Sequence, residues 1–205
     1  MRTPKVGVAP VEPGYGDYMV MRRKRVTDQV ITLSALQPDD IDKVRKWRNR
    51  QLGVLRQGVK ISRKAQENYF LSEVWPGKQQ PKPNQLLLGI KTGGRLIGYG
   101  GLVNISWANR NSELSFLLDP KIEGNSKART EFFIRYLRII LEIAFSDLNL
   151  FRVWTETYEN RGEHIAGLEE VGFVQEGRLR SHILCDDLVM DSILHGLLRT
   201  EWRLD

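Results

Sequence analysis

The fold is decided by the stretch from Asn125 to Phe173, which reads NSKARTEFFIRYLRIILEIAFSDLNLFRVWTETYENRGEHIAGLEEVGF. Its pattern predicts a loop, a long helix over Glu131 to Asp147, a strand over Phe151 to Tyr158, a second loop and a short helix. The charged residues in the middle of the long helix fall on one narrow stripe, and the rest is apolar. We therefore expect this helix to be buried on most sides.

The short helix carries signals at both ends. Asn160 is expected to cap its start, with Glu163 three residues on, as in a capping box. Gly172 is expected to follow its C-cap, with Phe173 folding back as the apolar partner. Because a helix N-terminus that faces an open strand end attracts anions, the stretch predicts a site for a phosphate-bearing ligand.

Composition limits the class of protein. The chain has 205 residues, 41% hydrophobic and 27% charged, as in one soluble globular domain. Its net charge of +6 favours anionic partners, and a basic surface without a dedicated partner is the alternative. One cysteine, Cys185, excludes an intrachain disulfide and a multi-cysteine zinc site. No apolar run approaches the roughly 20 residues of a membrane span, and no signal-peptide core is present, so we expect a cytoplasmic protein without membrane association.

Residues 1–28 have the composition of a flexible segment. They contain three prolines and three glycines and end in the basic run Arg22-Arg23-Lys24-Arg25. This predicts an extended, flexible basic arm that precedes a single domain over residues 29–205. We interpret the basic run as a solvated tail, so nucleic acid is not expected as a partner; a nucleic-acid contact is the alternative.

The remaining signals predict the order β, α, α, β, β, β, α, β, α, β, β, and hence an α+β domain with a mixed sheet. Gly98, Gly100 and Gly101 lie inside a strand with no helix after them, so they predict a bulge or a close backbone approach rather than a dinucleotide loop. The other expected elements are a strand over Val30 to Leu36, helices over Ile41 to Arg50 and Ser62 to Val74, a loop over Trp75 to Asn84, a hairpin of Gln85 to Lys91 with Arg95 to Ile105, a strand over Arg110 to Leu118, and a pair of Val174 to Leu184 with Leu188 to Leu198.

Several local strings carry a resemblance to a known family. They are Trp47-Arg48-Asn49 at the end of the first helix, Gly98 to Leu102 before Arg110 to Phe116, Ala144-Phe145 through Leu148 to Leu150, Gly172-Phe173 before Glu176 to Arg180, and Asp191 in the last strand. In this order, from about Val30 to Trp202, they resemble the GNAT superfamily of acetyl-CoA-dependent N-acetyltransferases, in particular its branch of ribosomal-protein N-terminal and nucleotide-amino-sugar acetyltransferases. The resemblance implies a twisted, mixed, mostly antiparallel sheet with helices on both faces.

The chain departs from the family pattern at two places. The family carries a glycine-bearing loop before the long helix, and here the segment Glu123 to Thr130 has only Gly124. The family often carries a tyrosine in its final helix as the general acid, and the corresponding residue here is Leu168. These departures leave open a relative that has lost catalysis and acts as a binding or interaction module.

The implied reaction is attack of an amine on the thioester of acetyl-CoA, which needs a base, a donor to the carbonyl oxygen and a proton for the thiolate. Glu113 is the first candidate for the base, and an exposed cross-strand ion pair is the alternative. His164 is the second candidate, with helix capping or stacking as the alternative. Tyr158 is the candidate donor to the thiolate, with rim packing as the alternative.

The resemblance also implies binding residues. The backbone of Phe116, Leu117 and Leu118 is expected to pair with the pantetheine arm of the cofactor, Asn160 to reach the same arm, and the segment Ser126, Lys127, Ala128, Arg129 and Thr130 to hold the pyrophosphate. The expected acceptor-site residues are Trp47, Arg48, Asn49, Trp107, Glu156, His182 and Asp191. His195, late in an apolar strand, is expected to be structural. No metal is expected, because no HExxH or paired Cys/His spacing occurs.

Together these observations predict transfer of an acetyl group from acetyl-CoA, the cosubstrate, to the primary amine of an amino sugar or a nucleotide-linked amino sugar. The alternatives are a protein α-amine as acceptor, a catalytically silent GNAT-like module, and a nucleic-acid binder that uses the basic arm. A homodimer is a further expectation.

Overall fold

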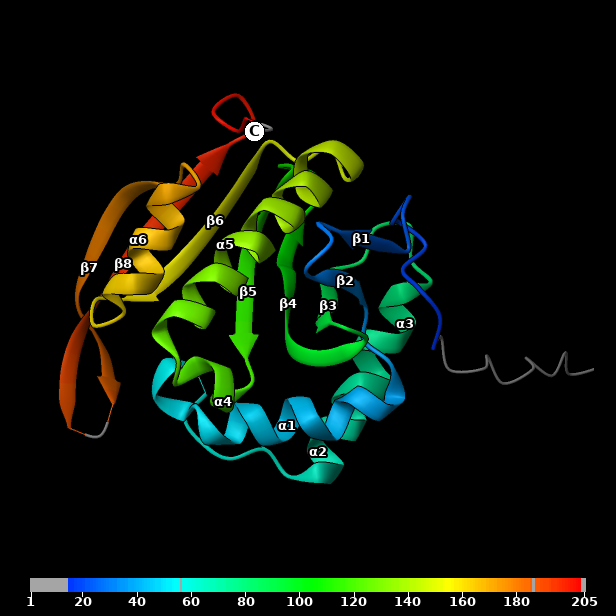
Figure 1. The fold of residues 1–205 in the computed structure, drawn as a ribbon, viewed down its shortest axis with the longest axis horizontal. Coiled ribbons are helices and arrows are strands. Elements are labelled where there is room, and N and C mark those ends of the chain that lie inside the picture. Colours follow the sequence, from blue (N-terminus) through cyan, green and yellow to red (C-terminus); the bar gives the residue numbers. More distant parts are fainter. Residues whose placement is uncertain (1–14, 56, 186, 204–205) are drawn as a thin grey trace, which may run out of the picture.

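A computed structural model describes residues 15–55, 57–185 and 187–203 and shows a twisted sheet at the centre of the molecule (Figure 1). The sheet has eight strands in the order β1-β2-β3-β4-β5-β6-β8-β7. All neighbouring strands are antiparallel except β5 and β6, which are parallel. The strands are β1 Arg25–Thr27, β2 Thr32–Ala35, β3 Leu86–Thr92, β4 Arg95–Ser106, β5 Asn111–Leu118, β6 Arg152–Tyr158, β7 Val174–Cys185 and β8 Leu188–Leu198. The predicted mixed, mostly antiparallel sheet is confirmed.

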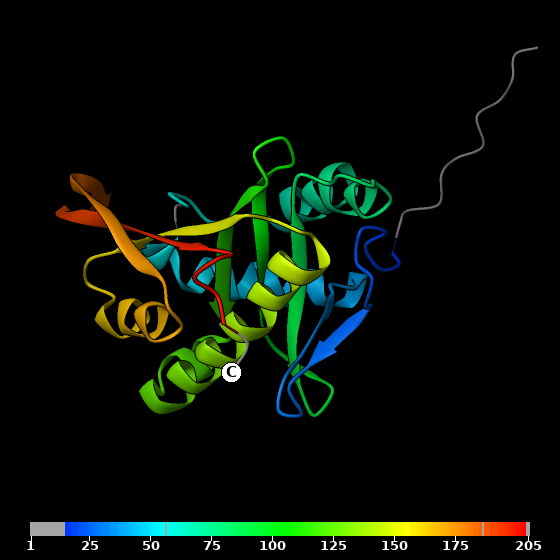
Figure 2. The same cartoon turned by 90° about the horizontal axis from the view of Figure 1, so that it is seen from above.

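Helices cover both faces of the sheet, as predicted. Figure 2 shows α5 and α6 on one side of the strands and α2 and α3 on the other. The helices are α1 Ile41–Arg50, α2 Arg63–Tyr69, α3 Trp75–Lys78, α4 Pro120–Glu123, α5 Ser126–Glu142 and α6 Gly162–Glu170. Two π-helical turns, Phe70–Val74 and Ile143–Asp147, prolong α2 and α5. One apolar core lies under α5 and a second lies under α1 and α2.

The parallel pair in the middle of the sheet is short. β5 and β6 pair through three residues each, ending at Glu113 opposite Trp154. Beyond these residues the two strands diverge, and the gap opens toward their C-terminal ends (Figure 1). The backbone edge of β5 after Glu113 therefore has no strand partner on the β6 side.

The glycines of β4 are confirmed as a close backbone approach. A Cβ atom on Gly100 would overlap the carbonyl oxygen of Ser115 and lie 2.7 Å from the hydroxyl of Tyr136. Tyr136 of α5 donates its hydroxyl to that same carbonyl at 2.5 Å. The absence of a side chain at Gly100 thus lets the long helix pack directly on the sheet.

Two predicted boundaries are wrong. The long helix begins at Ser126 and not at Glu131, because the side chain of Asn125 accepts the N–H of Ala128 at 3.1 Å and caps an earlier start. The segment expected as a loop after Val74 instead begins with the helical turn α3, in which Pro76 occupies an early position where its missing N–H costs nothing.

The predicted flexible arm is also wrong for the part of it that the structure describes, residues 15–28. Tyr18, Met21 and Val26 are buried in the main core, and Arg25–Thr27 forms the edge strand β1. Arg23, from the basic run, bonds to the carboxylates of Glu142 and Asp147 near the end of α5. Burial and this long-range ion pair outweigh the local proline and glycine signals. Residues 1–14 lie outside the described part of the chain.

The short helix starts differently from the prediction. It begins at Gly162 with Arg161 as the N-cap residue, so Asn160 does not cap it. Its end is as predicted: Gly172 has a φ of +101°, and the N–H of Phe173 bonds to the carbonyl of Leu168 at 3.0 Å. Within the described ranges, no helix has the length and apolar character needed to cross a membrane.

Candidate active site

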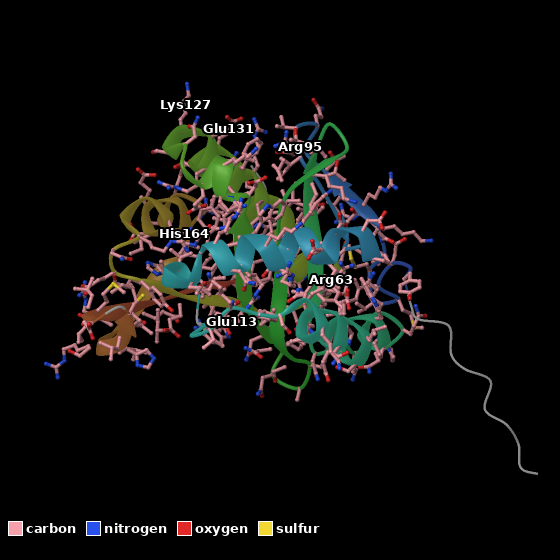
Figure 3. The ribbon with its side chains drawn as sticks, turned by 90° about the horizontal axis from the view of Figure 1, so that it is seen from below. Arg63, Arg95, Glu113, Lys127, Glu131 and His164 are labelled. Carbon is pink, nitrogen blue, oxygen red and sulfur yellow. The ribbon has the colours of Figure 1, made fainter. Side chains whose placement is uncertain are left out.

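The gap between β5 and β6 encloses a cavity of about 120 Å³. Its walls come from both diverging strands and from the start of α6, and include Glu113, Ser115, Phe116, Glu156, Tyr158, Arg161 and His164. The structure thus brings together all three predicted catalytic residues, which come from three different elements. Figure 3 marks Glu113 on β5 and His164 on α6.

Glu113 lies at the closed end of the gap. It is 2% exposed, so it does not belong to an exposed cross-strand ion pair. Asn104 donates its side-chain amide to the carboxylate at 2.8 Å. Asn104 has a φ of +51° and sits where the register between β4 and β5 shifts, so a bulge turns its amide toward Glu113. A buried, oriented carboxylate in the wall of a cavity is suited to accept a proton.

His164 is a stacking residue in this structure. Its ring lies on that of Phe133, with centroids 3.9 Å apart and planes 20° apart, and a second aromatic ring, Phe116, is 6.0 Å away. Burial, followed by the positive charges of Arg161 and Arg129, holds the pKa of His164 well below its usual value. The imidazole is therefore neutral near neutral pH and a weak proton acceptor.

Glu156 and Tyr158 alternate along β6 and line the same cavity as Glu113. Both are largely buried: the side chain of Glu156 is 8% exposed and Tyr158 is 6% exposed. Tyr158 also borders a neighbouring cavity of about 400 Å³ that includes His182. His182 approaches Glu156, with 3.8 Å between Nε2 and Oε1. Of the predicted acceptor residues, these two therefore lie at the gap.

The N-terminal ends of α5 and α6 meet beside a cavity of about 300 Å³, which includes Asn160. Arg129 donates to the main-chain carbonyl of Glu123 at 2.8 Å and to the carboxylate of Glu163. Ser126 donates its hydroxyl to the same Glu163 carboxylate at 2.9 Å. Glu163, which the sequence placed in a capping box, instead joins the two helices.

Acetyl-CoA needs an edge for its amide-rich arm and positive groups for its phosphates, and the residues present supply both. The free edge of β5 includes Phe116, Leu117 and Leu118, although the carbonyl of Leu118 accepts from the side chain of Gln51 at 2.9 Å. Arg129 and Arg161 line the helix junction. The chain therefore fits the cofactor.

The predicted pyrophosphate segment does not act as one unit. Ser126 and Arg129 face the junction, whereas Lys127 is exposed and points outward from the start of α5 (Figure 3). The N–H of Ala128 bonds to Asn125, and Thr130 lies within the helix. The helical start thus leaves fewer open amides than a glycine-bearing loop does.

Three of the other predicted acceptor residues, Trp47, Asn49 and Asp191, lie apart from the gap, whereas Arg48 lines a cavity between α1, α2 and the sheet. Trp47 packs in the core under α1 and is 7% exposed. The side chain of Asn49 bonds to the backbone of Ile61. Asp191 accepts from Arg178 and from the N–H of Ser181 within the last hairpin. These three residues shape their surroundings and line none of the cavities described here.

One predicted acceptor residue lies away from the site, and three residues that were not predicted belong to it. Trp107 donates its indole N–H to the carbonyl of Pro83 at 2.8 Å, outside these cavities. Asn104, Arg161 and Glu123 contribute to the site and were not predicted. An asparagine inside an apolar strand was the one signal in the sequence that marked Asn104 as unusual. Among the described residues no cluster of three metal-ligating side chains occurs.

Comparison with known proteins defines the class to which this fold and site belong. A family model described as an acetyltransferase (GNAT) domain matches residues 33–194. Because the match covers most of the chain, this protein belongs to the GNAT family of acetyltransferases, whose acetyl donor is acetyl-CoA.

Individual relatives are more distant. The chain is 26% identical over 126 residues to the Bacillus subtilis protein named "Putative ribosomal N-acetyltransferase YdaF", covering 62% of this chain and 66% of that protein. It is 30% identical over 84 residues to spermidine N(1)-acetyltransferase of Vibrio cholerae, covering 41% of this chain and 46% of that protein. In both cases the match spans less than two thirds of the relative.

The similarity in fold extends further along the chain. A crystal structure of spermidine N-acetyltransferase from Vibrio cholerae in complex with CoA and spermine has a TM-score of 0.75. The two chains are 19% identical, and the match covers 85% of this chain and 98% of that chain. At this identity the likeness concerns the fold.

Proposed function

We propose that this protein transfers the acetyl group of acetyl-CoA to a primary amine at the gap between β5 and β6. The observation that carries the proposal is the end of the strand pairing at Glu113 and Trp154, which leaves an open backbone edge beside a buried carboxylate. Membership in the GNAT family supports the same reaction.

The cofactor supplies an activated thioester carbonyl when it is bound. The backbone edge of β5 from Phe116 to Leu118 is our proposed site for its amide-rich arm, by addition of a strand-like partner. Ser126, Arg129 and Arg161 are the proposed contacts for its phosphates, because their donors face the helix junction. Asn160 lines the same junction.

The chain's own residues provide the proton transfers. We assign the general base to Glu113, which accepts the amine proton at its carboxylate, directly or through a water. Asn104 orients that carboxylate. Tyr158, at the end of β6, is the proposed donor of a proton to the departing sulfur. His164 supports the wall of the gap by stacking and is a poor base because its pKa is depressed.

The acceptor is a primary amine, and an amino sugar, free or nucleotide-linked, is our first candidate. A protein α-amine is the second candidate and is supported by the similarity to the relative named as a ribosomal N-acetyltransferase. The relatives named for spermidine add a polyamine to the acceptors that must be tested.

The test is calorimetric titration with acetyl-CoA and with CoA, followed by a thiol-release screen over these three amine classes. We expect binding in the micromolar range and turnover of at least one class. Cofactor binding without any turnover would favour a silent binding module. No binding of either cofactor form would overturn the proposal; binding to nucleic acid that weakens steeply with salt would then favour the alternative partner.

Assembly and location stay predictions. A structure of the dodecameric spermidine N-acetyltransferase from Vibrio cholerae matches this chain at 20% identity with a TM-score of 0.68. In the present chain the edge strand β7 is exposed along most of its length, which supports a homodimer. We also retain a cytoplasmic location as an expectation.

A further inference from the structure

A further cavity, of about 410 Å³, lies between α1, α2 and the sheet. It shares Val103 and Ser115 with the cavity at the β5–β6 gap, so the two spaces adjoin. An amine whose reactive nitrogen reaches Glu113 can therefore place its remaining atoms in this adjoining cavity. We call it the acceptor cavity; the lining residues that matter here are Arg48, Gln66, Tyr99, Val103 and Ser115.

The charge on the lining of the acceptor cavity is positive. Among its described lining residues Arg48 is the charged one, and no aspartate or glutamate occurs. Arg48 bonds to two neutral groups, the hydroxyl of Tyr99 at 2.9 Å and the side-chain oxygen of Gln57 at 2.8 Å. No described carboxylate forms an ion pair with it. A guanidinium has five N–H donors, so donors remain for a ligand.

Two further donors face the acceptor cavity. Gln66 is 4% exposed and lines the cavity, and its side-chain amide makes no hydrogen bond with any described residue. Tyr99 accepts from Arg48, which leaves its own hydroxyl hydrogen without an acceptor in the described part of the chain. Burial raises the pKa of Tyr99, so the phenol keeps this proton. Both side chains form part of the wall of the acceptor cavity, so a ligand in this cavity can accept their hydrogen bonds.

We propose that the acceptor cavity binds an anionic oxygen group, a carboxylate or a phosphate, carried by the amine that is acetylated. Arg48, Gln66 and Tyr99 are the donors to this group. The inference rests on the proposed function and narrows its substrate class. It separates this protein from relatives named for spermidine, because a second ammonium group in the acceptor cavity meets the charge of Arg48 with no carboxylate beside it.

The experiment compares amines that differ only at the end remote from the reactive nitrogen. Pentylamine, cadaverine and 5-aminopentanoate carry a methyl, an ammonium and a carboxylate group at that end. Glucosamine and glucosamine 6-phosphate make the matching pair for phosphate, so the two arms distinguish the two anions. Thiol release at fixed acetyl-CoA gives kcat/KM for each amine, and calorimetry gives binding in parallel.

We expect the anionic member of at least one series to have the highest kcat/KM and cadaverine to have the lowest of its series. Arg48→Gln should reduce the preference for the anionic member by about 10-fold to 100-fold, as for loss of a charge-assisted hydrogen bond. Arg48→Lys should restore part of it. Arg50→Gln is the matched control, because Arg50 lies on the same helix, is exposed and lines none of the cavities described above.

The outcomes are distinguishable. Preference for cadaverine, or an unchanged preference in Arg48→Gln, overturns the anion site even if acetyl transfer is observed. If no amine is turned over, the proposed function fails, and calorimetry still shows whether the acceptor cavity binds an anionic group. Glucosamine 6-phosphate or 5-aminopentanoate must then bind more tightly than its neutral partner, with the difference lost in Arg48→Gln. A thermal unfolding scan of each variant shows that a loss of binding is not a loss of fold.

Discussion

Replacing Glu113 with glutamine tests the assignment of the general base. The change removes the charge and keeps the shape of the side chain. The glutamine oxygen can still accept the amide of Asn104, which donates to Glu113 at 2.8 Å. The position is 2% exposed, so the new amide stays in the same packed surroundings.

The expected effect on rate is large and the effect on stability is small. Loss of a positioned general base lowers the rate by about 100-fold to 10,000-fold. This corresponds to about 3 to 5 kcal/mol of activation free energy. Because one buried hydrogen bond is retained, we expect the free energy of unfolding to change by about 1 kcal/mol or less.

The assay is kcat/KM by thiol release for the best amine found in the screen, with CoA affinity measured by calorimetry. We expect Glu113→Gln to lose turnover while CoA affinity stays within about twofold. The reason is that the carboxylate is proposed to act on the amine during the reaction and not to bind the cofactor. The matched control is Glu170→Gln, an exposed glutamate of α6 that lines none of the cavities described above. A Glu113→Gln protein with turnover close to that of the unchanged chain would refute the reasoning.

Three further perturbations follow from the same geometry. Glu163→Gln should tighten CoA binding several-fold in calorimetry, because the carboxylate that Arg129 holds no longer competes with phosphate; weaker binding would show that the ion pair builds the site. Gly100→Ala should destabilise the fold by about 1 to 3 kcal/mol in urea unfolding, because its methyl group overlaps Tyr136 and the sheet; an unchanged midpoint would contradict that packing. His164 has a lowered pKa, so the unfolded chain binds its proton first, and stability falls as pH drops below about 6.5, by up to about 1.4 kcal/mol per pH unit. His164→Gln should flatten that acid limb, and an unchanged slope would assign it to another group.

Local signals predicted the elements whose ends are fixed by neighbouring residues. Helix α1 has the predicted bounds, Ser62 caps α2 at the predicted start of the second helix, and Gly172 follows the end of α6 as predicted. Each of these features depends on a cap, a turn residue or a short apolar period. Such interactions lie within a few residues of one another and can be read from the chain.

The predictions that were wrong depend either on contacts with residues far away in the sequence or on a residue that suits two local structures equally well. Asn125 suits both a loop and a helix cap, and the structure uses it as a cap. Arg23 reads as part of a solvated run until Glu142 and Asp147 are placed beside it. No local pattern reports an ion pair between residues more than one hundred positions apart.

In the candidate site, too, the sequence predicted which residues take part but not the features that depend on distant contacts. The sequence and the family resemblance named Glu113, Tyr158 and His164 as candidate catalytic residues, and the structure brings all three to the lining of one cavity. Burial of Glu113 and the positive φ of Asn104 arise from how β4 and β5 align, which the sequence does not specify. The pKa of His164 likewise depends first on its burial, and then on the charge of the neighbouring Arg161 and of Arg129 from the start of α5.

The short parallel pairing of β5 and β6 also bears on the order of folding. These strands meet only after the intervening segment has crossed over through α5, whereas β3 and β4 are joined by a tight turn. Parallel pairing between distant segments closes a long loop and is intrinsically slow. In a refolding experiment the far-ultraviolet signal of helices and hairpins should therefore recover before the capacity to bind CoA. The newly made chain would pass through a stage that is compact but cannot yet hold its cofactor.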